Sequence, residues 1–404
     1  MKRRLTFLLF AFFMLGSLWA QMEVSGILDS TVSLRAGAGD APEFSWGIEE
    51  FANIRFEAEL REGGMFFGAV NLFAAAGDYA AAAAQMAAVT TAQGYAPAGM
   101  APVFYVGGEN YIAGFELERL YFRLNGENTD FDAGLFRLPF GLGQAWGPSD
   151  FLNPKNPLKP DARPRGVLGA SFSWFPSDDF KLLVFSAAGR DPFSQDGSGI
   201  LAGISTDHYW NRVSMQTLYS YETPNKIDAA EAPHKISSAY GIHRAGLSVK
   251  ADVEIGIVMD ALYTYNHEAK TKEDGLSFSA GADYSFFNGN LIVLAEYLYN
   301  GKTSSTARGY GGGFSNNHYL YTSFTWIIDD FTNLTAALIS GFDDISFTPV
   351  ISLNYDIFQG AVLTITAQIP MDRDLFLKDG NRGELGPQSV MNYFYLNGKL
   401  RLRF

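Results

Sequence analysis

The strongest constraint on the fold of this chain is a two-residue periodicity that recurs in stretches of about ten residues. In residues 345–357 apolar side chains occupy the odd positions, and mostly polar side chains occupy the even positions. The same alternation occurs in 276–286 and in 239–253. Because successive side chains of a β-strand point to opposite faces, the pattern predicts strands with one apolar and one polar face.

The lengths of the connections decide between the folds that such strands can build. Nearly every second connection is tight, as at Asn211-Arg212 and Asp329-Asp330, and those between are mostly long. A β-sandwich gives no reason for this sorting, whereas membrane barrels have short periplasmic turns and long external loops. The sequence therefore predicts an all-β fold, a single transmembrane antiparallel β-barrel of about 18 strands, or 16 if the weak pair in 199–222 is miscounted. The predicted strands are 23–35, 44–60, 64–75, 111–125, 129–139, 166–175, 180–188, 199–209, 213–222, 238–252, 254–266, 275–286, 290–300, 318–328, 331–340, 345–357, 361–370 and 390–404.

The first twenty residues have the features of an export signal. Lys2, Arg3 and Arg4 precede an apolar run, and Ala20 offers a cleavage site. We therefore expect a signal peptide at 1–20 and the barrel at 21–404. Without the three leader cations the net charge falls from -13 to about -16, which argues against a nucleic-acid partner.

The end of the chain supports a membrane barrel independently. Phe404 is the last residue, and Leu402, Leu400, Leu396 and Phe394 share its face of the final strand. The pattern resembles the C-terminal strand of outer-membrane barrels, which places an aromatic residue against lipid and is recognised by the barrel-assembly machinery. The resemblance implies the cell outer membrane as location, and its lipid and the barrel-assembly machinery as partners.

The most distinctive connection is 140–165, in which five prolines exclude a strand. Its W-x-x-x-D-x-x-N-P segment, followed by an Arg-Pro element, resembles a segment of porin-like proteins from Gram-negative bacteria and spirochaetes. The residues that match are Trp146, Asp150, Asn153, Pro154, Arg163 and Gly166. The resemblance covers this loop and its flanking strands, and it implies a pore-forming barrel without specifying a substrate.

By position, 140–165 is the third external loop, which in porins commonly folds into the lumen. One hypothesis is that it forms the constriction of the pore, and the alternative is that it packs on the rim and braces the barrel. The candidate constriction residues are Trp146, Asp150, Asn153, Lys155, Lys159, Asp161, Arg163 and Arg165. The Ala-rich external loop 76–110 favours a short helix that covers the rim or acts as a lid.

A second set of candidate residues lies on the polar faces of strands near the two ends of the chain. The predicted pore-lining residues are Arg55, Glu57, Arg119, Tyr121, Arg123, Arg137, Lys399, Arg401 and Arg403. Since the first and last strands are neighbours in a closed barrel, the basic residues would offer anions an electrostatic path. The alternative is that arginine and glutamate side chains pair across strands and neutralise one another.

The sequence offers little for an enzyme. The five histidines are scattered without H-E-x-x-H spacing, there is no cysteine, and we assign no catalytic residue, cofactor or metal. The function predicted is a porin for passive diffusion of small polar solutes, as a monomer or a homo-oligomer. The alternatives are a structural or adhesive surface barrel with a plugged lumen, and a transporter of hydrophobic molecules.

Overall fold

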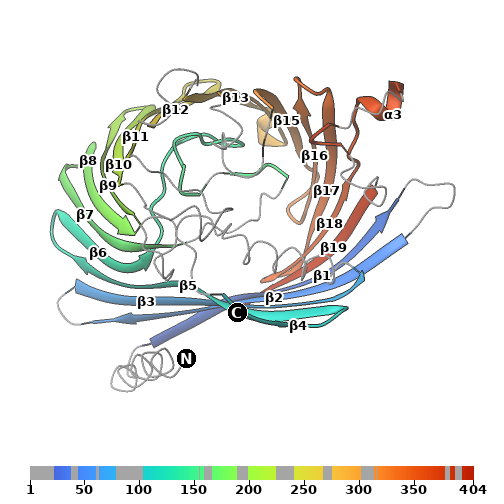
Figure 1. Ribbon diagram of the computed structural model, residues 1–404, viewed down its shortest axis with the longest axis horizontal. Coiled ribbons are helices and arrows are strands. Elements are labelled where there is room, and N and C mark those ends of the chain that lie inside the picture. Colours follow the sequence, from blue (N-terminus) through green and yellow to red (C-terminus); the bar gives the residue numbers. More distant parts are fainter. Residues whose placement is uncertain are drawn as a thin grey trace, which may run out of the picture.

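The structure is a computed structural model that describes residues 22–37, 44–60, 63–78, 103–153, 155–158, 166–188, 199–223, 241–266, 275–301, 314, 316–377, 383–386 and 394–404. The predicted signal peptide and most of the Ala-rich loop lie outside these residues. Within them, nineteen strands form one antiparallel sheet. Strand β4 pairs only with β5, and the other eighteen close into a barrel, as predicted (Figure 1).

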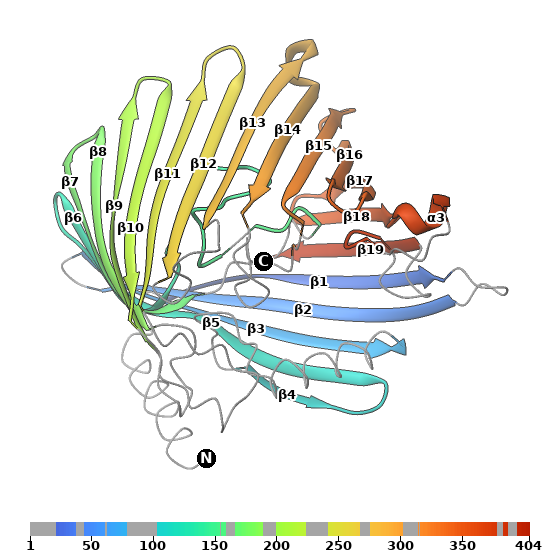
Figure 2. The ribbon, with the colours of Figure 1, turned by 45° about the horizontal axis from the view of Figure 1, so that its top comes forward.

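The first half of the wall contains β1 (Met22–Ala36), β2 (Phe44–Glu59), β3 (Gly64–Gly77), β4 (Val103–Gly107), β5 (Tyr111–Asn125), β6 (Thr129–Phe136), β7 (Val167–Ser177), β8 (Phe180–Ala188), β9 (Ile200–Trp210) and β10 (Val213–Glu222). The second half contains β11 (Ile242–Asp252), β12 (Gly256–Asn266), β13 (Leu276–Phe286), β14 (Leu291–Asn300), β15 (His318–Ile327), β16 (Thr332–Gly341), β17 (Ser346–Phe358), β18 (Ala361–Gln368) and β19 (Phe394–Arg403). The strands are strongly tilted and run side by side around the barrel (Figure 2).

The barrel closes where the first strand pairs with the last. Strand β1 is antiparallel to β19 in a register that sets Ile27 opposite Arg403 and Ala36 opposite Phe394. Gly26 and Phe404 extend this ladder through two backbone hydrogen bonds, N–O 2.8 and 3.1 Å. A Cβ atom on Gly26 would lie 2.7 Å from the Phe404 ring, so only glycine lets the terminal aromatic side chain cover this seam.

Every strand that the sequence predicted is present, with two corrections. Residues 103–107, predicted as part of an external loop, form β4. The run Val-Phe-Tyr-Val favours a β-strand, and it pairs with the part of β5 that the short β6 does not reach. Strand β6 ends at Phe136 instead of 139, because Leu138 and Phe140 leave the wall and are buried against Leu183 and Phe185.

The predicted alternation matches the two faces of the wall. On β17 the side chains of Ile351, Tyr355 and Ile357 are exposed on the outer surface. On the inner surface Ser352 and Asn354 donate or accept hydrogen bonds with side chains of neighbouring strands. An apolar exterior with a polar interior is the arrangement of a membrane barrel and the reverse of a soluble one.

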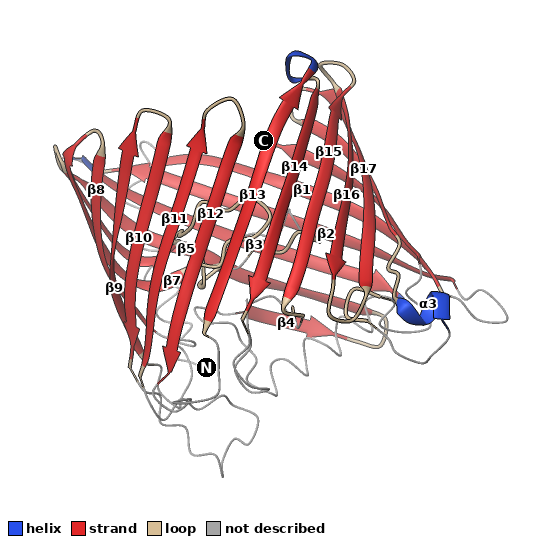
Figure 3. Cartoon of the chain, turned by 90° about the horizontal axis from the view of Figure 1, so that it is seen from above, coloured by secondary structure: helices blue, strands red, loops and turns tan. Residues whose placement is uncertain are grey.

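The tight turns gather at one end of the barrel (Figure 3). Asn211 has a φ of 51° and Gly360 a φ of 90°, conformations that asparagine and glycine adopt readily in two-residue hairpin turns. None of the helices in the described part of the chain has the length and apolar character needed to traverse a bilayer.

The assignment of faces can be tested with two adjacent positions on β17. We expect Ile351→Lys, on the outer face, to reduce the free energy of folding into lipid vesicles by about 2–4 kcal/mol, because it exposes a charge to hydrocarbon. Ser352→Lys, on the inner face, should cost less than about 1 kcal/mol. Denaturant unfolding in vesicles measures both, and equal losses would contradict the assignment.

Candidate pore and its inner loop

Residues 137–153 leave the end of β6 and lie inside the barrel, along the inner surface of β10 to β15 (Figures 1 and 2). Five successive wall strands, β10 to β14, form hydrogen bonds with the segment. The Gly141 N–H donates to Gln216 of β10 over 2.6 Å, and the Ser149 hydroxyl lies 3.0 Å from that of Ser248 on β11. The Gln144 side chain donates to Asp283 of β13 over 2.6 Å. The segment therefore lines one side of the lumen.

Glu296 of β14 is the strongest single anchor of this inner loop. Its carboxylate accepts three consecutive backbone N–H groups, from Gln144, Ala145 and Trp146, at 3.0, 2.9 and 3.0 Å. Glu296 is almost fully buried. Hydrogen bonds to a charged acceptor are roughly twice as strong as neutral ones, so a buried carboxylate with three donors fixes the backbone conformation here.

Asp260 of β12 anchors the loop a few residues further on. One of its carboxylate oxygens accepts the Ser149 hydroxyl at 2.5 Å and the Ser149 N–H at 3.2 Å. A Cβ atom on Gly141 would lie only 2.3 Å from the other carboxylate oxygen of Asp260. The loop backbone therefore approaches this carboxylate at a glycine, which also has a φ of +76°. Close approach of main chain to wall is possible only without a side chain at this position.

Apolar contacts hold both halves of the loop against the wall. Leu138, Phe140 and Leu152 pack on Leu183 and Phe185 of β8. The inner face of this sector is thus apolar, unlike the generally polar inner face that the sequence predicted, and the loop covers it. At the other half, Trp146 is fully buried among side chains that include Phe314, Tyr319, Ile339 and Leu385.

Asp150 lies at the turn of the loop, with only 2% of its surface exposed. Its backbone carbonyl and its carboxylate both accept the N–H of Asn153, at 3.1 and 3.3 Å. Burial raises the pKa of the Asp150 carboxyl from its ordinary 3.8 to about 7, although the nearby cations Arg137 and Lys155 oppose this shift. The group therefore exchanges its proton near neutral pH.

The structure places four of the eight candidate constriction residues. Trp146, Asp150 and Asn153 belong to the inner loop described above, and Lys155 donates from its ammonium group to the Gly143 carbonyl. Lys159, Asp161, Arg163 and Arg165 lie outside the described residues.

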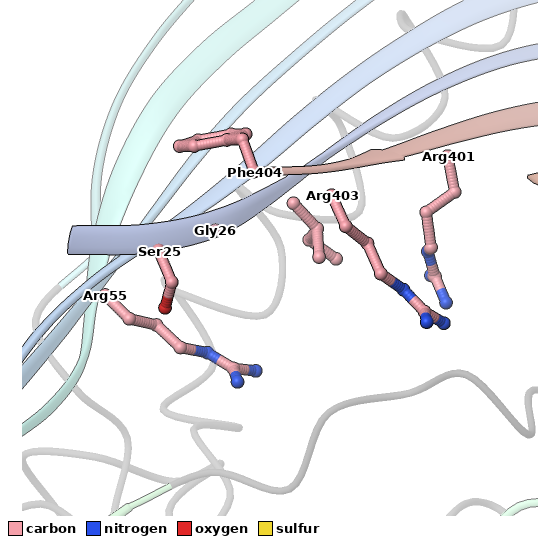
Figure 4. A pocket seen from close by; sticks show the side chains of 7 residues that line it. Ser25, Gly26, Arg55, Arg401, Arg403 and Phe404 are labelled. Atoms are coloured by element: carbon pink, nitrogen blue, oxygen red, sulfur yellow. The ribbon is translucent and has the colours of Figure 1, made fainter. Parts of the chain in front are cut away.

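Three of the predicted pore-lining arginines come together on the opposite wall. Arg55 of β2, and Arg401 and Arg403 of β19, line one pocket of about 410 Å³ with Ser25, Gly26, Ile27 and Phe404. Their side chains project to the same side of the sheet, and Phe404 lies on the other side (Figure 4). Because β19 lies beside β1 and β2 only through barrel closure, the fold itself creates this group of cations.

Only one of the three arginines, Arg401, is neutralised by a carboxylate among the described residues. Arg401 is held by Asp29, its direct cross-strand neighbour on β1, through two hydrogen bonds of 2.7 Å. Arg55 donates to the side-chain oxygen of Asn53 over 2.8 Å. In the described part of the chain neither Arg55 nor Arg403 forms an ion pair with a carboxylate, so both present net positive charge to the lumen.

A β-bulge on β5 determines how Glu118 and Arg119 are placed on the wall. Ala69 of β3 is opposite Arg119, whereas Val70 is opposite Leu117, so Glu118 is the extra residue. The bulge lets Glu118 and Arg119 lie 3.6 Å apart as an ion pair. Glu118 also accepts the Asn53 amide over 2.5 Å, which ties the bulge to β2.

The remaining predicted pore-lining residues are in mixed environments. Arg123 forms two hydrogen bonds, 2.6 and 3.0 Å, with Asp132, its cross-strand neighbour on β6. Tyr121 packs 5.2 Å from the Phe67 ring. Glu57 on β2 and Arg137 after β6 are exposed, and Lys399 is half-buried on β19. Pairing across strands therefore accounts for some of these charges, and not for Arg55 or Arg403.

Glu296 and Asp260 were missed by the sequence reasoning. Each is a lone carboxylate in an otherwise apolar or aromatic strand, LIVLAEYLYN and GIVMDALYTYN, at a position whose neighbours in sequence face lipid. An isolated acid of this kind in a membrane strand requires a partner inside the barrel. The sequence thus indicates that each of these carboxylates has a partner inside the barrel, but it does not indicate which loop supplies that partner.

Comparisons with known proteins agree with this architecture. No protein-family model matches the sequence, and no curated protein does. Among solved structures, a BenF-like porin from Pseudomonas fluorescens is similar with a TM-score of 0.57 and 9% identity, over 96% of this chain and 99% of that one. OccK7 (OpdD) of Pseudomonas aeruginosa has a TM-score of 0.56 at 9% identity, covering 96% and 99%. OccAB4 of Acinetobacter baumannii has a TM-score of 0.56 at 10% identity, covering 95% and 98%. At these identities the likeness is one of fold.

The role of Glu296 as an anchor predicts a local effect of its removal. We expect Glu296→Ala to leave three backbone N–H groups without an acceptor and to destabilise the inner loop by about 2–4 kcal/mol. Hydrogen exchange followed by mass spectrometry should then show faster exchange in peptides that contain 144–149, with unchanged exchange in β16 and β17. Glu254→Ala, in an exposed turn, is the control, and unchanged exchange in Glu296→Ala would refute the anchor.

The raised pKa of Asp150 predicts that the inner loop is more stable in mild acid. The folded state holds the proton up to about pH 7 and the opened loop only to about pH 4, so stability falls as pH rises between these values. Between pH 5.5 and 8 the loss should be about 2 kcal/mol, measured as hydrogen exchange of the loop corrected for intrinsic rates. Asp150→Asn cannot ionise and should abolish this dependence; a dependence that survives in the variant would assign it to another group.

Proposed function

We propose that this chain is an outer-membrane porin, exported by residues 1–20, through which small polar solutes diffuse passively. The observation that carries the proposal is the division of the interior into two unlike sectors. One sector, from β6 to β15, is covered by the inner loop, and the other carries lumen-facing arginines on β19, β2 and β5. Side chains alone cannot fill a barrel of eighteen strands, so a water-filled passage remains between the sectors.

The inner loop would act as the constriction of this passage. Its backbone is fixed by wall carboxylates and by buried aromatic side chains, so it would keep its position while solutes pass. Lys159, Asp161, Arg163 and Arg165, which lie outside the described residues, are proposed to add charge to the same constriction. Weak contacts at several places allow both entry and exit, which passive diffusion requires.

The positive wall favours anionic over cationic permeants. Arg55 and Arg403 have no acidic partner among the described residues, whereas Arg401, Arg119 and Arg123 each have one. A net positive charge in a narrow, partly desolvated passage concentrates anions there. This preference arises from a few residues and is independent of the acidity of the whole chain.

The lipid-facing Phe404 and the apolar exterior support the partners proposed for the barrel itself. These are the outer-membrane lipid around its wall and the barrel-assembly machinery at its last strand. The lumen lies within one chain, so the proposed pore is the same for a monomer and for a homo-oligomer.

Single-channel recording in a planar bilayer tests the porin directly. The refolded chain should give steady openings, and a salt gradient should give a reversal potential of the sign expected for anion preference. Arg55→Ala combined with Arg403→Ala should reduce the anion-to-cation permeability ratio about three- to tenfold, because two unneutralised cations are removed.

Arg212→Ala, in an exposed periplasmic turn, is the matched control and should leave the ratio unchanged. A correctly folded barrel that stayed silent would overturn the open pore and favour a plugged surface barrel. A conducting barrel whose selectivity ignored both arginines would retain the porin and reject the positive wall.

A further inference from the structure

The outer surface of β10 to β15 carries a belt of aromatic side chains at the ends of the strands that meet the long connections. In Figure 3 these ends lie opposite the tight turns. The belt contains Tyr219, Tyr221, His243, Tyr263, Tyr265, Phe278, Tyr297, Tyr299 and His318. Its members share the outward parity of exposed neighbours such as Leu247 on β11 and Phe324 on β15. Two of the members are histidines, and they are the only titratable bases in the belt.

The first histidine, His243, is the second residue of β11. Its cross-strand neighbours are Tyr221 on β10 and Tyr265 on β12, with ring centroids 4.7 and 6.3 Å away. Its Nδ1 atom lies 2.8 Å from the hydroxyl of Tyr219, which is two residues further into the wall on β10. A tyrosine hydroxyl therefore fixes one edge of the imidazole ring.

The second histidine, His318, repeats this arrangement on β15. Its cross-strand neighbour is Tyr299 on β14, with ring centroids 5.4 Å apart, and its Nδ1 atom lies 2.6 Å from the hydroxyl of Tyr297. Both clusters thus consist of a Tyr-x-Tyr pair near the end of one strand and a histidine at the start of the next. The same arrangement therefore occurs twice, on two separate strand pairs.

The hydrogen bond to tyrosine determines what the other ring nitrogen offers. When the tyrosine hydroxyl donates to Nδ1, the neutral ring carries its proton on Nε2. When the ring is protonated, Nε2 also carries a proton, and the tyrosine oxygen accepts from Nδ1. In these two states Nε2 is a donor, whereas in the other neutral tautomer Nδ1 donates to the tyrosine and Nε2 is an acceptor. The described residues provide no hydrogen-bond partner for Nε2 of either histidine.

The location of the belt identifies the acceptor. Aromatic girdles of membrane barrels lie at the level where hydrocarbon meets headgroups. At the end with the long connections this level belongs to the outer leaflet. The acceptor available there is the phosphate of a lipid headgroup, which attracts an N–H donor strongly because it is charged.

We propose that His243 and His318, each oriented by a tyrosine hydroxyl, form two binding sites for phosphate-bearing headgroups of outer-leaflet lipids. In these sites the rings of Tyr221, Tyr265 and Tyr299 would pack against the apolar part of the same lipid. The proposal rests on the outer-membrane location proposed above, but not on conduction through the lumen.

The third histidine on the outer surface provides an internal control. His208 lies at the opposite end of the wall, on β9, with its ring 4.8 Å from Phe180 and 5.2 Å from Trp210. It is also surrounded by aromatic rings, but no tyrosine hydroxyl orients it among the described residues, and it faces the other leaflet.

The test measures binding of lipid A to the purified full chain in detergent by native mass spectrometry, with dephosphorylated lipid A as the comparison. Substitution of a histidine by phenylalanine keeps an aromatic ring at the position and removes the N–H donors. His243→Phe combined with His318→Phe should weaken binding of lipid A at least tenfold, on the order expected for loss of a hydrogen bond to a charged group. Binding of dephosphorylated lipid A should not change, and His208→Phe should bind both lipids as the native chain does. Tyr219→Phe combined with Tyr297→Phe should cause a smaller loss, because these tyrosines only position the rings.

Several results would overturn the proposal. Native affinity for lipid A in the double histidine variant would show that the histidines do not contact the headgroup. Equal affinity of the native chain for the two lipids would show that the belt recognises apolar surface alone. Displacement of lipid A by inorganic phosphate would identify a site for the free anion instead. Single-channel conductance of the same preparations separates these outcomes from a failure of the pore, since conductance should be unaffected by either substitution.

Discussion

The pairing of the first strand with the last is the interaction on which the rest of this structure depends. In hydrocarbon every unpaired backbone N–H or C=O costs several kcal/mol, so a sheet can reside in a membrane only if it has no free edges. Ten registered residue pairs join β1 to β19 and remove them. The same register has a functional consequence. It brings cations that are about 350 residues apart in sequence, Arg55 and Arg403, to one pocket. The selectivity proposed for the pore is therefore a product of closure.

A closed barrel of this size creates a second requirement, because its interior is too wide for side chains to fill. The chain meets it asymmetrically. From β6 to β15 the inner face carries apolar side chains and lone carboxylates, which would be unfavourable against water or without partners. The inner loop supplies both missing components: Phe140 and Trp146 cover the apolar surface, and its backbone N–H groups reach Glu296. From β17 to β5 the inner face carries mainly hydroxyl, amide and charged groups, several of which form hydrogen bonds across strands, as Ser352 does with Thr366. The position proposed for the passage rests on this difference.

The fold could be predicted from sequence almost completely, and the site only in part, for a physical reason. Alternation along a strand and the length of a turn are local properties, so the strand list, the strand number and the outward orientation of residues such as Ile351 and Phe404 were accessible. Strand β4 was missed because its pairing with β5 is decided by where the short β6 ends, which is a tertiary event. The partners of Arg401 and Arg123 required the register, and a shift by one residue would have reversed every face. The contacts of the inner loop are the hardest case, because Trp146 and Glu296 are 150 residues apart and no periodicity connects them.

The barrel contains two kinds of carboxylate, which differ in what lies across the strand from them. Asp29 and Asp132 lie directly across from arginines, so each pair is neutral and its contribution is to the wall. Glu296 and Asp260 face no cation across the strand, and backbone donors from the loop stabilise them instead. Arginines opposite uncharged positions, such as Arg403 opposite Ile27 and Arg55 opposite Ser25, keep their charge for the lumen. For these residues the neighbour thus separates the roles: an arginine directly opposite makes Asp29 and Asp132 parts of the wall, and loop donors make Glu296 and Asp260 anchors. The arginines proposed to act on solutes, Arg55 and Arg403, are those without an acidic partner among the described residues.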